Sequence, residues 1–285
     1  MSLDRLTALA AYAGLGEAGT PAPSRAGGLA GGRRGEGGSD LHDLRPFVDG
    51  DDPRRIDAAA TARSGRPQVR TFHEDAERVA LLVADFRRPM LWGTKGRLRS
   101  VAAAEALALE GWRAVGAGGR VGLAAVRDAE TVMLAPKPRE GAMLAAAGAL
   151  ARAHDDAMAA PPVTAGPSVA GGPSAAAEPL SRVLERVTAT LPRAAAVILA
   201  TGLDAPGADF EPVTLALARR CRLVVLLVRD AVEETPPPAA LPVRAGGAVR
   251  HVRFAPSDAA ARLTALGVEH RIVRAWMPAV EEASA

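Results

Sequence analysis

A regular alternation of apolar runs and helically spaced apolar residues begins at Val79 and continues toward the end of the chain. The run VALLVAD has the length and composition of a buried strand. Helical spacing follows at Leu98, Val101, Ala104, Ala108 and Trp112. The segments VGLAAV and TVMLAP are separated only by RDAE, which is too short for a parallel crossover and predicts an antiparallel edge strand. GAMLAAAGALARAHDD predicts another helix.

The second half of the chain repeats this alternation. Pro179 suits the first turn of a helix, and AAAVILA, RLVVLLV and VEHRIV are predicted as strands separated by helices. Strands that are apolar throughout and alternate with helices are typical of a mostly parallel sheet covered on both faces. We therefore predict an α/β fold, doubly wound, with a mostly parallel sheet and one antiparallel edge strand.

The pattern also divides the chain into segments. Residues 1–32 are predicted to form a short helix, capped by Ser2, followed by a flexible Gly- and Pro-rich lead-in. Residues 33–75 form an Arg- and Asp-rich segment expected to pack on the main domain, which spans 76–285. Within that domain, residues 159–177 are rich in Pro, Gly and Ala and predict a flexible insert.

Composition narrows the class of protein. No apolar run approaches the roughly 20 residues of a membrane helix, and the amino terminus lacks the pattern of a signal peptide, so we expect a cytoplasmic protein without membrane insertion. The single cysteine, Cys221, excludes an internal disulfide. The net charge is only +3, arginines alternate with carboxylates, and aromatic residues make up 3% of the chain, so nucleic acid is not an expected partner.

Two carboxylates follow buried strands and could meet at the crevice beyond the strand ends. Asp85 ends VALLVAD, and Asp204 follows AAVILATGL. Such a pair could hold a hard cation such as Mg²⁺, but Arg87, Arg88 and Pro89 supply no side-chain oxygen to complete its coordination. The alternative is that Asp85 caps the loop or pairs with a nearby arginine.

A second polar cluster lies in the segment RRGEGGSDLHDLRPFVDGDDPRRIDAAATARSGRPQVRTFHED. Its charged residues either lock the segment through Arg–carboxylate pairs or form a partner-recognition surface. The candidate residues are Arg45, Asp51, Arg54, Asp57, Arg63 and Arg70.

Motifs of common enzyme classes are missing. The glycines of VGAGGRVG follow a helix and precede a strand, which is the reverse of a dinucleotide fingerprint, and there is no phosphate-binding GxxxxGK[ST] motif or GxSxG elbow. The five histidines are scattered without metal-ligand spacing. The sequence therefore favours a protein that is not an enzyme.

The Arg- and Asp-rich segment at residues 33–75 resembles the bacterial domain-of-unknown-function 58 family. The matching steps are GEG, RPF, GD, RIDA, AR and VRTFHE, which fall at residues 35–37, 45–47, 50–51, 55–58, 62–63 and 69–74. The later pieces GGRVGL, PKPREG and VRDAVEETPPP extend the resemblance over Arg33 to Pro238. It implies a von Willebrand factor type A-like fold and an association with MoxR-type AAA+ ATPases in the assembly or metal loading of other proteins.

The sequence departs from the metal-binding motif of such domains. That motif reads Asp-x-Ser-x-Ser, and here its positions are Asp85, Arg87 and Pro89, so that both hydroxyls are missing. We therefore expect a degenerate metal site without a cofactor, in which Arg87 or Arg88 neutralises Asp85, together with Asp204.

The resulting hypothesis is a non-enzymatic adaptor that binds a MoxR-type ATPase and other von Willebrand A-like proteins, through the crevice or the Arg/Asp-rich segment. Two alternatives stay open. One is a metal-dependent ligand-binding or hydrolytic α/β protein that uses Asp85 and Asp204. The other is a structural subunit whose Arg/Asp-rich segment only holds the fold.

Overall fold

The computed structural model divides the chain into two compact units. The larger unit comprises Met1–Pro23 and Arg78–Ala285, and the smaller comprises Ser24–Glu77. The structure describes residues 1–14, 43–48, 56–71, 78–160, 178–245, 248–254 and 257–282. Most of the predicted insert at 159–177 lies outside these ranges.

A six-stranded sheet forms the centre of the larger unit, in the order β10-β7-β6-β3-β4-β5. Its strands are β3 (Val79–Asp85), β4 (Arg120–Val126), β5 (Thr131–Pro138), β6 (Ala196–Thr201), β7 (Arg222–Arg229) and β10 (Glu269–Arg274). All neighbouring pairs are parallel except β4 and β5. The predicted α/β fold, with its mostly parallel sheet and one antiparallel edge strand, is confirmed, and the strand order is consistent with a von Willebrand A-like domain.

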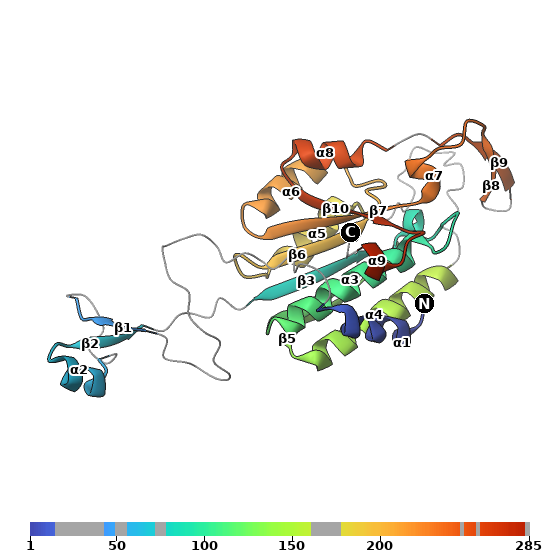
Figure 1. Ribbon diagram of the computed structural model, residues 1–285. Coiled ribbons are helices and arrows are strands. Elements are labelled where there is room, and N and C mark those ends of the chain that lie inside the picture. The colour runs from blue at the N-terminus through green and yellow to red at the C-terminus, as the bar shows by residue number, and fades with distance from the viewer. Residues whose placement is uncertain are drawn as a thin grey trace. The chain divides into compact units, whose positions relative to one another are not determined.

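Helices cover both faces of this sheet because its central strands are apolar on both sides. In β3, Leu82 and Ala84 join the core beneath α3 and α4, whereas Leu81 and Val83 join the core beneath α5, α6 and α8. Figure 1 shows the two helical layers on opposite faces. Their bounds are α3 (Arg99–Gly116), α4 (Glu140–Ala159), α5 (Leu180–Thr188), α6 (Phe210–Ala218) and α8 (Ala259–Ala265).

The amino-terminal helix α1 (Leu3–Ala8) packs on the first of these layers, followed by the 3₁₀ turn η1 (Leu9–Tyr12). Ser2 caps α1, since its hydroxyl accepts a hydrogen bond from the Arg5 backbone N–H. Leu6 is fully buried, and its carbonyl accepts a 3.0 Å hydrogen bond from the Trp112 indole. The helix therefore contributes to the core of the larger unit.

The smaller unit contains a two-stranded antiparallel ribbon, β1 (Asp43–Pro46) and β2 (Gln68–Thr71), and one helix, α2 (Ala58–Ser64). Asp57 caps α2 by accepting a 2.7 Å hydrogen bond from the Ala60 backbone N–H. Gly65 ends the helix with φ 68°, a left-handed conformation that glycine adopts without steric cost. The local sequence thus encodes both ends of α2.

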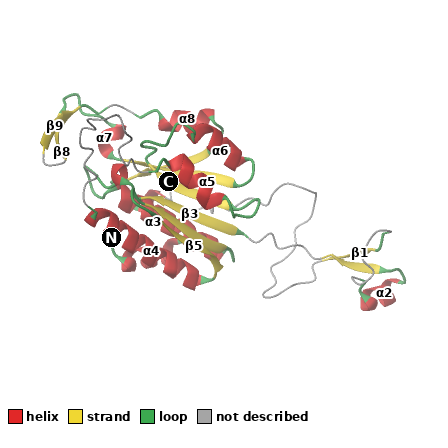
Figure 2. Ribbon diagram, turned by 180° about the vertical axis from the view of Figure 1, so that it is seen from behind, coloured by secondary structure: helices red, strands yellow, loops and turns green. Residues whose placement is uncertain are grey.

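The remaining described elements are a turn after β3 and four short elements in the carboxyl-terminal half. They are the turn η3 (Arg88–Met90), the short helices α7 (Ala231–Glu234) and α9 (Ala279–Glu282), and an antiparallel hairpin, β8 (Leu241–Ala245) and β9 (Ala248–Val252). Figure 2 shows the hairpin at the same end of the larger unit as α7. None of the helices in the described ranges combines the length and apolarity of a membrane span.

Candidate functional site

The carboxyl ends of three adjacent strands bring the predicted carboxylates together. Asp85 is the last residue of β3, Asp204 lies three positions beyond the end of β6, and Asp230 directly follows β7. Because β7, β6 and β3 are neighbours and run parallel, these side chains come from one edge of the sheet. We call this edge the crevice.

The carboxylate of Asp85 is held by the guanidinium of Arg87 in a buried two-pronged ion pair. Arg87 Nε lies 2.8 Å from Oδ1, and Nη2 lies 2.8 Å from Oδ2. The Arg87 backbone N–H also donates to Oδ1 over 3.2 Å, and the Thr201 hydroxyl donates to Oδ2 over 2.7 Å. The two side chains are only 2% and 4% exposed. Every oxygen of Asp85 is therefore occupied by donors from the protein.

The local sequence explains this geometry. Phe86 is 1% exposed and packs edge-on against the ring of His154, with the ring centroids 5.7 Å apart. Its burial in the α3/α4 core directs the residues on either side of it toward the crevice. Burial lowers the pKa of Arg87, but the hydrogen bond and negative charge of Asp85, together with Asp128 and Asp204, outweigh it and raise that pKa above its ordinary value. Arg87 is thus a permanent cation.

Arg87 also fixes the loop that follows β6. Its Nη1 donates to the carbonyl of Ala205 and its Nη2 to the carbonyl of Asp204, each over 3.1 Å. Leu203 and Ala205 have φ angles of 60° and 44°, which are left-handed conformations unfavourable for residues with a side chain. The guanidinium therefore stabilises the strained loop that follows β6.

A second arginine, Arg99 at the start of α3, neutralises Asp204. Its Nη2 lies 2.6 Å from Asp204 Oδ2, its Nη1 lies 3.6 Å from Glu233 Oε1, and its side chain is fully buried. The guanidinium also packs 5.2 Å from the centroid of the Trp92 ring. Gly202 makes room for it, because a Cβ atom there would overlap Arg99 Nη2. The sequence reasoning did not identify Arg99 or Glu233.

The end of β7 completes the cluster. Asp230 accepts a 2.8 Å hydrogen bond from the Thr94 backbone N–H and forms a capping box with Glu233 at the start of α7. Burial raises the pKa of Glu233 despite the nearby positive charge of Arg99. Burial also lowers the pKa of Arg229, despite the negative charge of Glu233. Paired charges thus extend across the crevice from Asp85 to Glu233.

Comparison with known proteins identifies the family. The model of the family described as "Protein of unknown function DUF58" matches residues 43–253 of this chain. The chain belongs to the DUF58 family. No curated protein matches it. The match includes β1, α2 and β2 of the smaller unit and every crevice residue described above.

The crevice of this DUF58 protein does not fit a divalent cation. Both Asp85 oxygens accept hydrogen bonds from Arg87, and Asp204 pairs with Arg99, whereas Mg²⁺ needs near-octahedral oxygen ligands and a guanidinium supplies none. Across the described ranges, no group of three His, Cys, Asp or Glu residues has the arrangement of a metal site. Arg87 and Arg99 instead supply the positive charge that the carboxylates require.

Arg88 lies apart from these ion pairs. Its backbone N–H donates to Asp128, and its side chain donates to the carbonyl of Ala160 over 3.0 Å. Of the two arginines proposed to neutralise Asp85, Arg87 is therefore the one that contacts it. Asp204 contacts the Arg87 guanidinium only through its backbone carbonyl.

The candidate residues of the Arg/Asp-rich segment belong to the smaller unit. Asp57 is 6% exposed and caps α2, and Arg63 is exposed on the last turn of that helix. Arg45 lies on β1 and Arg70 on β2, in a ribbon that pairs Arg45 with Val69 and Leu44 with Arg70. Asp51 and Arg54 lie outside the described residues. The contacts of Asp57 give it a structural role within this unit.

Proposed function

We propose that this DUF58 protein is a cytoplasmic, non-enzymatic adaptor that binds other proteins, with a crevice derived from a metal site but occupied by arginine. The observation that carries the proposal is the set of four donors to Asp85: the two-pronged Arg87 guanidinium, the Arg87 backbone N–H on Oδ1 and the Thr201 hydroxyl on Oδ2. Such a carboxylate has no lone pair directed at a substrate or a metal ion.

The same contacts speak against acid–base chemistry by the crevice residues. A general base must reach a substrate proton with a free lone pair and a pKa near the working pH. Both oxygens of Asp85 accept hydrogen bonds from Arg87, and Oδ2 of Asp204 accepts one from Arg99, so these oxygens are already engaged by protein donors. The alternative hydrolytic role for these two residues therefore has little chemical support.

A rigid crevice is well suited to protein recognition. Arg87 holds the carbonyls of Asp204 and Ala205, so the loop presents its exposed residues in one conformation. Preorganised loops reduce the entropy lost on binding. The family resemblance supplies the partner: a MoxR-type AAA+ ATPase, with other von Willebrand A-like proteins as further partners.

Capture of the tagged full-length protein from its native lysate, with and without ATP, tests this proposal by mass spectrometry. We expect a MoxR-type ATPase to be recovered in an ATP-dependent manner. Ala205→Arg, on the exposed part of the loop, should reduce recovery, whereas Arg193→Glu, near the opposite end of β6, should not. Failure of the folded wild-type protein to recover an ATPase would remove the ATPase assignment. Hydrolytic activity lost in Asp204→Ala would instead favour the enzyme alternative.

A further inference from the structure

The β8–β9 hairpin is separate from the main sheet, and its charged residues are all basic. We call its described residues, 241–245 and 248–254, the basic hairpin. The two strands pair only with each other among the described strands, with Leu241 opposite Val252 and Pro242 opposite His251. No Asp or Glu occurs between Glu234 and Asp258. The same interval contains Arg244, Arg250, His251 and Arg253.

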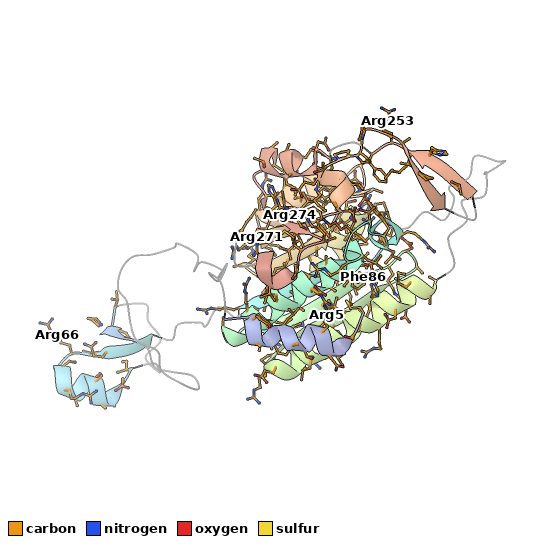
Figure 3. The ribbon with its side chains drawn as sticks, turned by 45° about the vertical axis from the view of Figure 1, so that its right-hand side comes forward. Arg5, Arg66, Phe86, Arg253, Arg271 and Arg274 are labelled. Carbon is orange, nitrogen blue, oxygen red and sulfur yellow. The ribbon has the colours of Figure 1, made fainter. Side chains whose placement is uncertain are left out.

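The exposed surface of the basic hairpin combines this charge with apolar side chains. Val249 and Val252 are 56% and 38% exposed. Arg253 is exposed and forms no ion pair with any residue in the described ranges, and Figure 3 shows it at the outer edge of the unit, directed away from the body. A two-stranded hairpin of this kind is only marginally stable by itself in water. It has both the charge and the apolar surface to gain stability from a partner.

Aromatic contacts attach the base of the basic hairpin to the crevice. The Phe254 and Trp92 ring centroids are 6.1 Å apart, and the Arg99 guanidinium also packs on the Trp92 ring. Arg99 in turn pairs with Asp204. Phe254 is thus connected through Trp92 to Arg99, one of the two arginines that neutralise the crevice carboxylates.

We infer that the basic hairpin is a docking element for an acidic surface of a partner protein. This inference rests on the proposed adaptor function and names the chemistry of the partner. Arg253, which forms no ion pair within the described ranges, complements carboxylates on another protein, and Val249 and Val252 supply the apolar contact area. The partner is expected to present Asp or Glu residues next to aliphatic side chains.

Other anionic partners fit the surface less well. Single-stranded nucleic acid is bound with aromatic stacking platforms, and Phe254, the single Phe, Tyr or Trp of the hairpin, already packs on Trp92. Insertion into a lipid surface requires large apolar groups such as Trp, Phe or Leu, whereas the exposed large apolar side chains among the described residues of the hairpin are Val249 and Val252. An acidic protein surface requires neither feature.

Fluorescence anisotropy with a labelled peptide of Glu and Leu residues tests the charge requirement in the full-length protein. Arg253→Glu should weaken binding about tenfold, and added salt should weaken binding of the wild type. Arg193→Glu makes the same change of charge at an exposed site and should leave the affinity unchanged. Equal affinities for wild type and Arg253→Glu would overturn the inference, provided that both proteins melt at the same temperature.

A second pair of variants tests the apolar contribution. Val249→Ser should weaken peptide binding, whereas Leu215→Ser, at a residue 39% exposed on α6, should not. Phosphatidylserine vesicles and a single-stranded oligonucleotide serve as rival ligands. If either binds more tightly than the peptide and loses affinity in Arg253→Glu, the assignment to a protein partner is wrong.

The outcome can be separated from that of the adaptor proposal. If the wild type captures an ATPase and Arg253→Glu captures it equally, the adaptor function stands and the docking role of the hairpin fails. If the hairpin binds the acidic peptide but the wild type captures no ATPase, the docking role stands and the ATPase assignment fails.

Discussion

Replacing Arg87 with Met should destabilise the larger unit because it leaves the Asp85 carboxylate buried without its counter-ion. The substitution removes the two-pronged pair, with contacts of 2.8 Å, and two 3.1 Å hydrogen bonds to the loop carbonyls of Asp204 and Ala205. Breaking a buried ion pair by removing one partner typically costs about 3–5 kcal/mol. For a domain of this size that loss lowers the melting temperature by about 6–20 °C.

Urea and thermal unfolding of the purified protein at pH 7 measure this loss. Arg186→Met is the matched control, since Arg186 forms an exposed pair with Glu178 and should cost at most about 1 kcal/mol. The double variant Asp85→Leu with Arg87→Met removes both charges and should be more stable than Arg87→Met alone. A loss below about 1 kcal/mol in Arg87→Met would refute the claim that Arg87 is the required counter-ion of Asp85.

Three further substitutions test other parts of the structure. Gly202→Ala should displace Arg99 from Asp204 and lower the melting temperature, whereas Gly141→Ala, where a Cβ meets no atom, should not. Burial of His154 lowers its pKa from 6.5, so the folded state binds fewer protons than the unfolded state. The free energy of unfolding should therefore fall as pH drops from 6.5 towards the folded pKa, by at most about 1.4 kcal/mol per pH unit. The fall should be less steep in His154→Gln. Asp57→Ala should lose about 1 kcal/mol of α2 stability, read as reduced hydrogen-exchange protection of α2 amides, whereas Asp57→Asn keeps a capping oxygen and should retain it.

Much of the fold could be predicted because its central strands are continuous apolar runs. VALLVAD and RLVVLLV are buried along their whole lengths apart from Arg222. An uninterrupted apolar run of strand length therefore predicted that both faces of these strands are covered. The β8–β9 hairpin was missed because Pro242 and the arginines interrupt its apolar alternation. Gly246 and Gly247 between two short β-branched segments were the available signal, since Gly-Gly favours a tight hairpin.

The candidate site could be predicted only where its residues are close in sequence. Asp85 and Arg87 are two positions apart, so their pairing could be expected, and both were named. Arg99 pairs with Asp204 across 105 positions, and only the tertiary fold reveals that contact. Glu233 had a local signal, because Asp230 and Glu233 have the spacing of a capping box. Nothing in the sequence around Gly202 indicates that this glycine accommodates the buried guanidinium of Arg99.

Calorimetric titration of the wild-type protein with Mg²⁺ and with Mn²⁺ tests the central claim most directly. Arg87 and Arg99 already neutralise Asp85 and Asp204, so we predict no saturable binding of either ion at the crevice. A saturable site of micromolar affinity that disappears in Asp85→Ala would contradict the account, because it would show that a cation displaces the Arg87 guanidinium from its carboxylate.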